Sequence, residues 1–597
     1  MLSYREYFLR PPTNKKASES TDTMLAVVPN GLFSDLKDTH QHYADTFGSV
    51  GYILPVAYSS LSPWLTGRPV GPLRINFPLI RNWLKHCKNN HSCTSRWSRP
   101  SDLHLIDCKS LDIVTAPPNC NYFALSYVWG KKGSESTPAP ASSQRPTPST
   151  RDLLRAAAPV VRDAIKVVQS LGSRYLWVDQ YCIPQTDPML KAEQIAKMDL
   201  IYEGAYCTIV AASGSSDQAG LHGVSIARYA QPSFTLDGYD VRLVSSLPDP
   251  QAAIKASTWM TRAWTYQEAL CSARRLVFNP HQVYFECKSM HSCEAVELPL
   301  SLLSGQHASP VLFSDEWLAG THRFGALSAF WAVVKAYSLR CMTFDSDSLA
   351  ALEGILRRFQ ASPAFVYNIF GIPLVLEDGP KGNKDALLDA RLFVAGLSWH
   401  HGGMARRRKQ FPSWTWAGWE GGVQLQRTFG REGYMSDVRL WVHGADDVTS
   451  PWDLFWEGFW GPAGKAKCYA RFVCLIIEAD VFKVQLVPRV YPQSPSAVTA
   501  AKSAICDMVS PYDSTVKYSS VMLPVGLVNE TKIATELWDC VMLGAKSKGG
   551  NPDIMLLRWD VDVAERIWVG TLWSQKSHEK LSRADFPPCL RKKFKLG

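Results

Sequence analysis

The fold of this chain is constrained most by an alternation of apolar and amphipathic segments between residues 121 and 287. Short apolar, aromatic runs predict buried strands, and apolar residues at three- and four-residue spacing predict helices. The predicted order is a strand at 121–130, a helix at 150–172, a strand at 174–183, a helix at 187–205, a strand at 206–214, a helix at 258–272, and a strand pair in "RRLVFN" and "QVYFEC". This order predicts an α/β fold, in which helices flank a parallel sheet.

Four residues predict where two of these helices begin and end. Asp187 and Pro188 suit the N-cap and the first position of the second helix. Gly172 suits the end of the first helix, and Pro159 within that helix either kinks it or marks its start.

The length of 597 residues is too great for one compact core and suggests two or three domains. Polar, turn-rich residues near the start predict a poorly ordered segment over 1–75. A first domain is expected at 76–290, with a lead-in helix in "LIRNWLKHC" and a core at 120–290. A Ser- and Pro-rich stretch predicts a disordered insertion at 131–150.

Residues 300–597 are expected to form a mixed α+β region of unknown role. Helices are predicted for "FGALSAFWAVVKAYSLR" and "LAALEGILRRF". Short strands or loops are predicted for "ARLFVAGLSWH" and "FPSWTWAGWEGGV".

The formal charge of +10 is a mild bias for a chain of this size. It fits attraction to anionic ligands such as nucleotides, but it falls short of the clustered basic face of a nucleic-acid-binding protein. The densest cluster, "ARRRKQ" at 405–410, is interpreted as a solvated loop in preference to a nucleic-acid contact or a nuclear signal. We therefore expect no nucleic-acid partner.

The segments that usually direct a chain to a membrane or to secretion are not evident. The first residues lack an apolar region followed by a cleavage site, and no run of about 18 apolar residues predicts a membrane span. Fifteen irregularly spaced cysteines are typical of reduced thiols, which predicts a cytoplasmic protein.

Several common catalytic motifs are missing from the sequence. No P-loop, no Gly-x-Gly-x-x-Gly after a strand and no Gly-x-Ser-x-Gly elbow occurs, which disfavours kinases, Rossmann enzymes and esterases. Cys182 follows an apolar strand and is interpreted as a buried structural cysteine rather than a nucleophile.

The stretch "HCKNNHSC" offers His86, Cys87, His91 and Cys93 as zinc ligands. Zinc usually takes four ligands from two pairs on separate elements, and no second pair lies nearby in the sequence. Packing at the end of the lead-in helix is therefore favoured over a metal site.

Polar and aromatic residues follow the first two predicted strands, in "SYVWG" and "VDQYCIPQ". Ligands of parallel sheets bind outside the carboxyl ends of the strands, which predicts a cleft near Ser126, Trp129, Asp179 and Gln180. Asp179 caps the next loop, pairs with an arginine such as Arg262, or faces a ligand, and the sequence does not decide between these roles.

In "TRAWTYQEAL", Trp264 and Glu268 stand four positions apart and so share one face of the predicted helix. Such a pair is common in helices whose Trp packs inward while the Glu pairs with a basic neighbour. By itself it gives little support to a catalytic role.

Taken in order, these stretches resemble the fungal heterokaryon incompatibility (HET) domain. The resemblance rests on "YFALSYVWG", on "YLWVDQYCIPQ" with "EQIAKMDLIYEGA", and on "STWMTRAWTYQEAL" with "RRLVF". It implies a role in heterokaryon incompatibility, the non-self recognition between fungal strains that leads to programmed cell death.

The same stretches are distantly similar to TIR domains, which bind nucleotides and in many cases hydrolyse NAD+. "YFALSY" and "YLWVDQ" stand where TIR domains have their first two strands, and Trp264-x-x-x-Glu268 matches the helix that carries the catalytic acid. This similarity implies a TIR-like parallel sheet and an NAD+ glycohydrolase in which Glu268 is catalytic.

Cleavage of the nicotinamide–ribose bond develops positive charge at ribose C1′, which a fixed carboxylate can stabilise. The expected substrate-binding residues are Ser126, Trp129, Gly130, Asp179, Gln180 and Trp264. NAD+ or a related nucleotide would be the substrate, and we expect no bound cofactor and no metal.

The main alternative is a catalytically inactive TIR-like interaction module, which signals by self-association or by binding an incompatibility partner protein. The position of Glu268 should discriminate between the two functions. A catalytic Glu268 would face a cleft at the strand ends beside Trp129 and Asp179, whereas a structural one would face solvent or pair across a helix interface.

Overall fold

The computed structural model of the chain divides into two compact units, residues 1–315 and residues 316–597. The residues that it describes are 25–26, 51–56, 66–93, 99–130, 154–236, 238, 241–300, 312–313, 323–363, 365–375, 390–425, 434–456, 462–489, 505–523, 533, 535–545, 550–572 and 587–597. The predicted insertion at 131–150 and most of the segment 1–75 lie outside these ranges.

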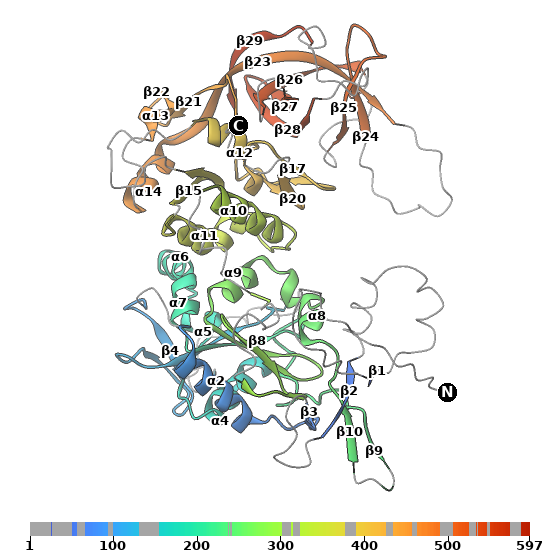
Figure 1. Cartoon of the computed structure of the whole chain (residues 1–597). Helices are drawn as coiled ribbons and strands as arrows, with labels where there is room; N and C mark the ends of the chain where they lie inside the picture. The colour runs from blue at the N-terminus through green and yellow to red at the C-terminus, as the bar shows by residue number, and fades with distance from the viewer. Residues whose placement is uncertain are drawn as a thin grey trace, which may run out of the picture. The chain divides into compact units, whose positions relative to one another are not determined.

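Unit 1 is built on an eight-stranded sheet, of which β4 and β8 are labelled in Figure 1. Its strand order is β13-β12-β11-β8-β6-β7-β4-β5. The four central strands, β11, β8, β6 and β7, run parallel, and antiparallel strands extend both edges. The strand bounds are β4 His104–Asp107, β5 Asp112–Thr115, β6 Tyr122–Ser126, β7 Tyr175–Trp177, β8 Cys207–Ala211, β11 Arg274–Phe278, β12 Val283–Cys287 and β13 His291–Cys293. The predicted parallel sheet and its closing strand pair, β11 and β12, are confirmed.

The chain passes from β6 to β7 on one side, then crosses to β8 and continues to β11 on the other. Because such crossovers are right-handed, helices that follow β6 and β8 lie on opposite faces of the sheet. Figure 1 shows α4 (Pro159–Ser170) on one face and α9 (Ala263–Cys271) on the other. The direction in which successive strands are added across the sheet thus reverses between β6 and β8. Open sheets of this type bind ligands at such a switch point.

Several of the predicted elements of unit 1 differ from those in the structure. The predicted helix at 187–205 is divided at Lys197 into α6 (Pro188–Ala196) and α7 (Met198–Gly204). The predicted strand at 174–183 is wrong in its second half, because β7 ends at Trp177 and the chain then forms a short helix, α5 (Asp179–Cys182). Cys182 in this helix is buried, and burial raises the pKa of its thiol to about 12, as suits a structural cysteine. The predicted helix at 258–272 is divided into a 3-10 turn, η2 (Trp259–Thr261), and α9 by an extended residue, Arg262.

The helix ends follow the signals in the sequence. Pro159 takes the first position of α4, so the proline marks the helix start rather than a kink. Gly172 follows the last turn of α4 with φ +77°, a left-handed conformation that glycine adopts without strain. Asp187 caps α6 (Pro188–Ala196), since its carboxylate accepts hydrogen bonds from the Met189 and Leu190 N–H groups at 2.9 and 3.1 Å.

The predicted lead-in helix is present as α2 (Phe77–Asn90). It packs near the sheet edge, where the Trp83 ring stacks on Phe285 of β12 with centroids 6.0 Å apart. The remaining elements of unit 1 are α7 Met198–Gly204, α8 Pro250–Lys255, a small sheet of β1 Leu25–Ala26, β2 Tyr52–Pro55, β10 Val241–Ser245 and β9 Ser233–Leu236, and the pair β3 Thr66–Gly67 and β14 Val296–Glu297.

Unit 2 begins with the two predicted helices, α10 (Arg323–Ser338) and α11 (Asp347–Gln360). The predicted strand or loop in "ARLFVAGLSWH" is partly wrong, because its first part forms helix α12 (Ala390–Gly396) before strand β17 (Trp399–His401). The other small elements are β15 Val366–Ile369, β16 Ile372–Val375, β18 Arg406–Arg407, η5 Trp416–Gly418, β19 Trp419–Glu420, β20 Val423–Leu425, α13 Trp452–Phe455 and α14 Pro462–Arg471.

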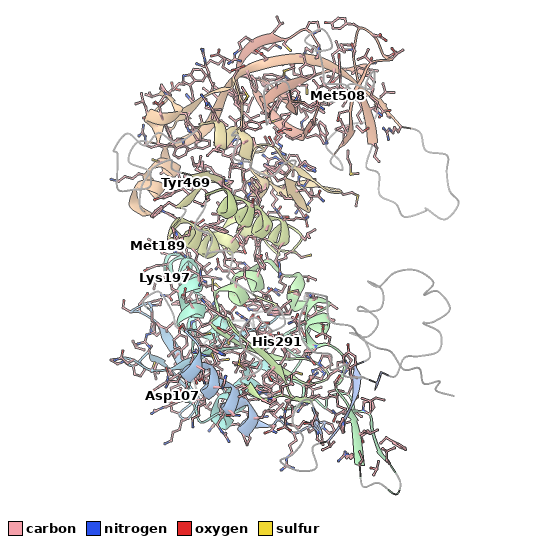
Figure 2. All side chains as sticks on the ribbon, viewed as in Figure 1. Asp107, Met189, Lys197, His291, Tyr469 and Met508 are labelled. Atoms are coloured by element: carbon pink, nitrogen blue, oxygen red, sulfur yellow. The ribbon has the colours of Figure 1, made fainter. Side chains whose placement is uncertain are left out.

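A nine-stranded, mostly antiparallel sheet forms the rest of unit 2. Its strands are β21 Arg439–Gly444, β22 Thr449–Pro451, β23 Phe472–Pro488, β24 Ile505–Val509, β25 Lys517–Met522, β26 Leu537–Gly544, β27 Asp553–Asp560, β28 Val563–Thr571 and β29 Leu590–Leu596. Because β23 pairs with both β26 and β29, the strands β23, β26, β27, β28 and β29 close into a ring. Apolar side chains fill its core, among them Met508 of β24 (Figure 2).

The basic run at 405–410 is folded into unit 2, so its interpretation as a solvated loop is wrong. Arg406 pairs with Asp345 at 2.8 Å and with Glu420 at 2.6 Å. Arg408 is 4% exposed and lies 3.2 Å from the same Asp345 carboxylate. Arg407 lies 3.8 Å from Glu565, so acidic partners within the unit engage all three of its arginines.

None of the described helices has the length and the apolar surface that crossing a membrane requires. All fifteen cysteines lie within the described ranges, and each is a free thiol, as predicted.

Candidate active site

The predicted site residues gather at the carboxyl ends of two adjacent parallel strands. Ser126 is the last residue of β6, and Asp179 opens α5 directly after β7. Because β6 is also one of the two strands that flank the switch point in strand order, Ser126 lies where an open α/β sheet binds its ligands.

Glu268, on the last turns of α9, is brought to this sheet edge by a hydrogen bond from the Ser126 hydroxyl to its Oε2. The Trp259 indole N–H in turn donates to the Ser126 oxygen at 2.8 Å. The serine therefore accepts one hydrogen bond and donates another, so its orientation toward the carboxylate is fixed. Glu268 and Ser126 are only 6% and 1% exposed.

Tyr202 of α7 also faces the Glu268 carboxyl. The Tyr202 hydroxyl, which donates to the Leu125 carbonyl at 3.1 Å, lies beside the Glu268 carboxyl. Glu268 thus lies against polar groups of a strand and a second helix, and it does not point into bulk solvent.

Asp179 forms a second polar cluster beside the first. Its Oδ2 accepts from the Trp129 indole at 3.0 Å, and its Oδ1 accepts from the Gln180 N–H at 2.7 Å. The Gln180 side chain accepts from the Tyr127 hydroxyl at 3.1 Å. These bonds hold Trp129, which is 39% exposed, beside a half-buried carboxylate.

The two carboxyl groups influence each other. Burial raises the pKa of Glu268 to about 7, hydrogen bonding from Ser126 lowers it, and the nearby charge of Asp179 raises it further. Burial also raises the pKa of Asp179 to about 6. The Arg262 charge lowers both pKa values, and its guanidinium also donates to the Trp129 carbonyl at 3.4 Å. Both acids therefore change charge close to neutral pH.

The other predicted site residues occupy the margin of these clusters. Trp264 is half-buried on α9, one turn before Glu268, and Gln180 is exposed. At Gly130 an added Cβ would lie 3.0 Å from the Asp217 carboxylate, so a larger residue would crowd this loop. Direct side-chain bonds thus join Ser126 to Glu268 and Trp129 to Asp179, whereas Gly130 and Trp264 are placed nearby by the backbone.

Two residues of the site have no functional signal in the sequence: Trp259, and Tyr202, which the helical pattern places only on the apolar face of its helix. Both stand within the stretches that resemble the HET domain, "STWMTRAWTYQEAL" and "EQIAKMDLIYEGA". Because their sequence neighbours are apolar, both residues look like ordinary core aromatics in the sequence. Only the structure shows the hydrogen bonds made by the Trp259 indole N–H and the Tyr202 hydroxyl.

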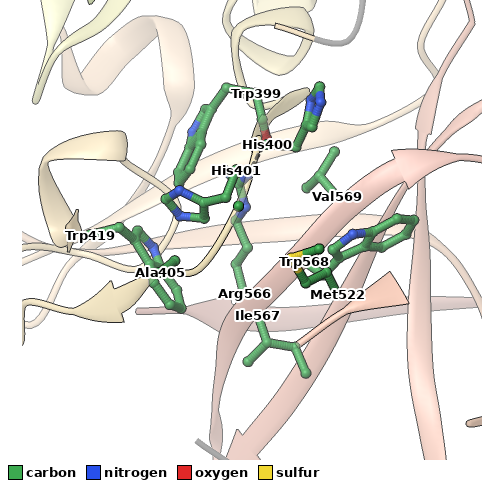
Figure 3. Close-up of a pocket in the computed structure, with 11 residues that line it drawn as sticks. Trp399, His400, His401, Ala405, Trp419, Met522, Arg566, Ile567, Trp568 and Val569 are labelled. Atoms are coloured by element: carbon green, nitrogen blue, oxygen red, sulfur yellow. Dashed lines mark hydrogen bonds between the residues drawn. The ribbon is translucent and has the colours of Figure 1, made fainter. Parts of the chain in front are cut away.

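Unit 2 contains a small pocket lined by Trp399, His401, Trp419, Arg566 and Trp568 among others (Figure 3). The Arg566 guanidinium lies 3.4 Å from the centroid of the Trp399 ring and donates to the Trp399 carbonyl. Burial, and then the Arg566 charge, lower the pKa of His401 to about 3, so its ring is neutral at physiological pH. The free space of about 10 Å³ holds about one water molecule, which suits a packed joint rather than a ligand site.

Comparison with known proteins finds a family model that matches part of unit 1. Residues 122–268 match the model of the family described as heterokaryon incompatibility protein (HET), a match that runs from the first residue of β6 to Glu268. Among curated proteins and among solved structures, nothing matches the chain. Ser126, Asp179 and Glu268, which lie together at the carboxyl ends of β6 and β7, are accordingly part of a HET domain at residues 122–268. This domain implies a role in heterokaryon incompatibility.

Proposed function

We propose that the HET domain hydrolyses NAD+, with Glu268 as the catalytic carboxylate, and that the loss of NAD+ executes incompatibility-type cell death. The observation that supports this proposal is the buried Glu268 carboxyl, held by Ser126 at the carboxyl end of the central strand with a pKa of about 7. Perturbed carboxyl groups at the ligand-binding edge of a sheet are typical of catalytic sites.

In the proposed reaction the bond between ribose C1′ and the nicotinamide nitrogen breaks, and its electron pair leaves with neutral nicotinamide. The ionised Glu268 carboxylate stabilises the positive charge that develops on the ribose, as carboxylates do in glycoside hydrolysis. Water then adds to C1′, and its proton is released to solvent. The products are nicotinamide and ADP-ribose.

Asp179 and Trp129 supply the binding functions in this proposal. With a pKa of about 6, the Asp179 carboxyl is largely ionised at pH 7 and can accept hydrogen bonds from ribose hydroxyls. The Trp129 side chain, which is 39% exposed, offers a stacking surface for a base.

The direct test is nicotinamide release from NAD+ by the purified full chain, compared with a Glu268→Gln variant. Removal of the carboxylate should lower kcat by about 100- to 1,000-fold, the usual effect of deleting one preorganised electrostatic group. Glu193→Gln, an identical change at an exposed position of α6, should leave the rate unchanged. Equal rates for the parent and Glu268→Gln would exclude the proposed role.

A second candidate function is an inactive module that signals by assembly. It is favoured by the depth of Glu268, since a carboxyl that is 6% exposed and bonded to Ser126 can also serve as a structural group. Expression of the full chain in cells separates the two functions. Cell death with falling NAD+ supports hydrolysis, whereas death at constant NAD+ supports assembly.

A further inference from the structure

A compact group of sulfur and nitrogen ligands lies outside the candidate active site, where the end of α2 meets the end of β12. Cys87 is on the last turn of α2, and His91 and Cys93 follow the helix. Cys287 is the last residue of β12, and 196 positions separate it from His91. The sequence pattern places His86 beside the first three of these residues as the fourth candidate ligand, because Cys287 is too distant along the chain to be recognised from spacing.

The four side chains converge on one point. One ligand atom from each of Cys87, His91, Cys93 and Cys287 lies within 4.8 Å of the other three. The His91 Nδ1 and the Cys287 Sγ are 3.4 Å apart. A tetrahedral zinc ion, with zinc–sulfur and zinc–nitrogen distances of about 2.3 and 2.0 Å, separates such atoms by roughly 3.5 to 3.8 Å.

The surroundings of the cluster supply donors to its sulfur atoms. The Ser289 N–H donates to Cys287 Sγ at 3.5 Å, and the Ser289 hydroxyl lies 3.9 Å from Cys93 Sγ. The Arg274 Nε–H donates to Cys87 Sγ at 3.1 Å. Hydrogen bonds of this kind to ligand atoms orient the ligands of metal sites.

The charge of a metal complex here would also be balanced. Zinc with three thiolates and a neutral imidazole carries one net negative charge. The Arg274 guanidinium, which is 7% exposed and in contact with Cys87 Sγ, supplies one positive charge at the same place. A buried charged complex requires a partner of this kind.

His86 does not belong to the ligand group, although it stands next to Cys87. Its ring meets the His91 ring edge-on at 5.4 Å, and its Nδ1 lies 3.3 Å from the Asn90 amide. The order of ligands is therefore Cys-x-x-x-His-x-Cys followed by one distant cysteine.

We propose that Cys87, His91, Cys93 and Cys287 form a structural zinc site that fastens the lead-in helix to β12 in the sheet of unit 1. Four protein ligands leave no open position for a substrate, so the site is structural rather than catalytic. Because the ligands come from elements so far apart in sequence, the ion fixes the position of α2 against β12.

Zinc analysis of the full chain, purified without a histidine tag and dialysed against a weak chelator, tests this site. We expect about one zinc per chain, as for other structural sites. Cys287→Ser should lose the zinc, while Cys108→Ser, the same change at a buried cysteine outside the cluster, should retain it. A parent chain without zinc, or a Cys287→Ser variant that keeps it, would overturn the proposal.

Cobalt substitution gives a second readout that does not depend on a folded variant. Full chain expressed in cobalt-supplemented, zinc-depleted medium should show a thiolate-to-cobalt charge-transfer band and intense visible d–d bands of tetrahedral Co²⁺. Cobalt bound without thiolate charge transfer, or a disulfide between two of these cysteines in the native chain, would contradict the site.

Discussion

At the scale of single residues, the candidate active site depends on the ionisation of Glu268. Ser126 is itself held by Trp259, so its hydroxyl is committed to the carboxyl of Glu268. Burial works in the opposite direction and raises the pKa of Glu268 to about 7. The carboxyl thus exchanges its proton in the pH range where cells operate, which leads to two predictions.

The first concerns the pH dependence of the proposed hydrolysis. Because only ionised Glu268 stabilises positive charge on the ribose, kcat/KM for NAD+ should rise with pH to a plateau, with a midpoint near 7. Initial rates of nicotinamide release from pH 5 to 9 measure it. A rate that falls through this range would show that the protonated acid is the active form.

The second concerns stability. The pKa of Glu268 is raised from 4.5 to about 7 on folding, so the folded chain holds this proton more tightly than the unfolded chain. The neutral acid contributes at most about 3 kcal/mol to the free energy of unfolding. This contribution is fully present below pH 4.5 and is lost as the pH rises through 7. Glu268→Gln stays neutral, and its stability relative to the parent should therefore increase from pH 4.5 to pH 8. Denaturant unfolding at both pH values measures the change, and an unchanged difference would mean that folding does not shift this pKa.

At the scale of helices and strands, local signals in the sequence were sufficient for most of unit 1. Asp187 caps its helix, Pro159 starts one, and apolar periodicity located the parallel strands. Periodicity could not show that the chain turns into α5 after Trp177, since four residues are too few to display a period. Nor could it pair Cys87 with Cys287, because that contact depends on how the sheet edge and α2 come together.

Gly172 provides a test at this scale. It holds φ +77° after α4, and an added Cβ would meet no atom within 4 Å, so only the backbone conformation opposes a side chain. Gly172→Ala should lower the free energy of unfolding by about 1–2 kcal/mol, the cost of left-handed backbone for an L-residue. Gly172→Asn should cost less, because asparagine tolerates this conformation. Equal losses in the two variants would point to a cause other than φ.

At the scale of the whole molecule, the two units have separate cores and different architectures, a mainly parallel sheet and a ring of mostly antiparallel strands. The sequence indicated the first by its alternating pattern. It left the second as a mixed region, because the closure of the ring is decided by pairings between distant strands such as β23 and β29.

This division predicts a selective effect of metal removal. The proposed zinc ligands all lie in unit 1, so a strong chelator should lower the unfolding temperature of that unit alone. Calorimetry of the full chain with and without chelator should show one transition moved and the other unchanged. If both transitions move together, or neither moves, the ion has a different place or is not part of the fold.

The ring of unit 2 also bears on how the protein is synthesised. β29 fills the space between β23 and β28, so the ring cannot close until residues 590–596 have been translated. β23 (Phe472–Pro488) is synthesised more than a hundred residues earlier. Its edge that pairs with β29 stays unpaired until those residues have been added. Unit 1, which contains the HET domain, lies entirely upstream and can complete its sheet on the ribosome well before then. A nascent chain would thus carry a finished HET domain attached to an aggregation-prone open sheet, which makes that interval the stage at which chaperones would be needed most.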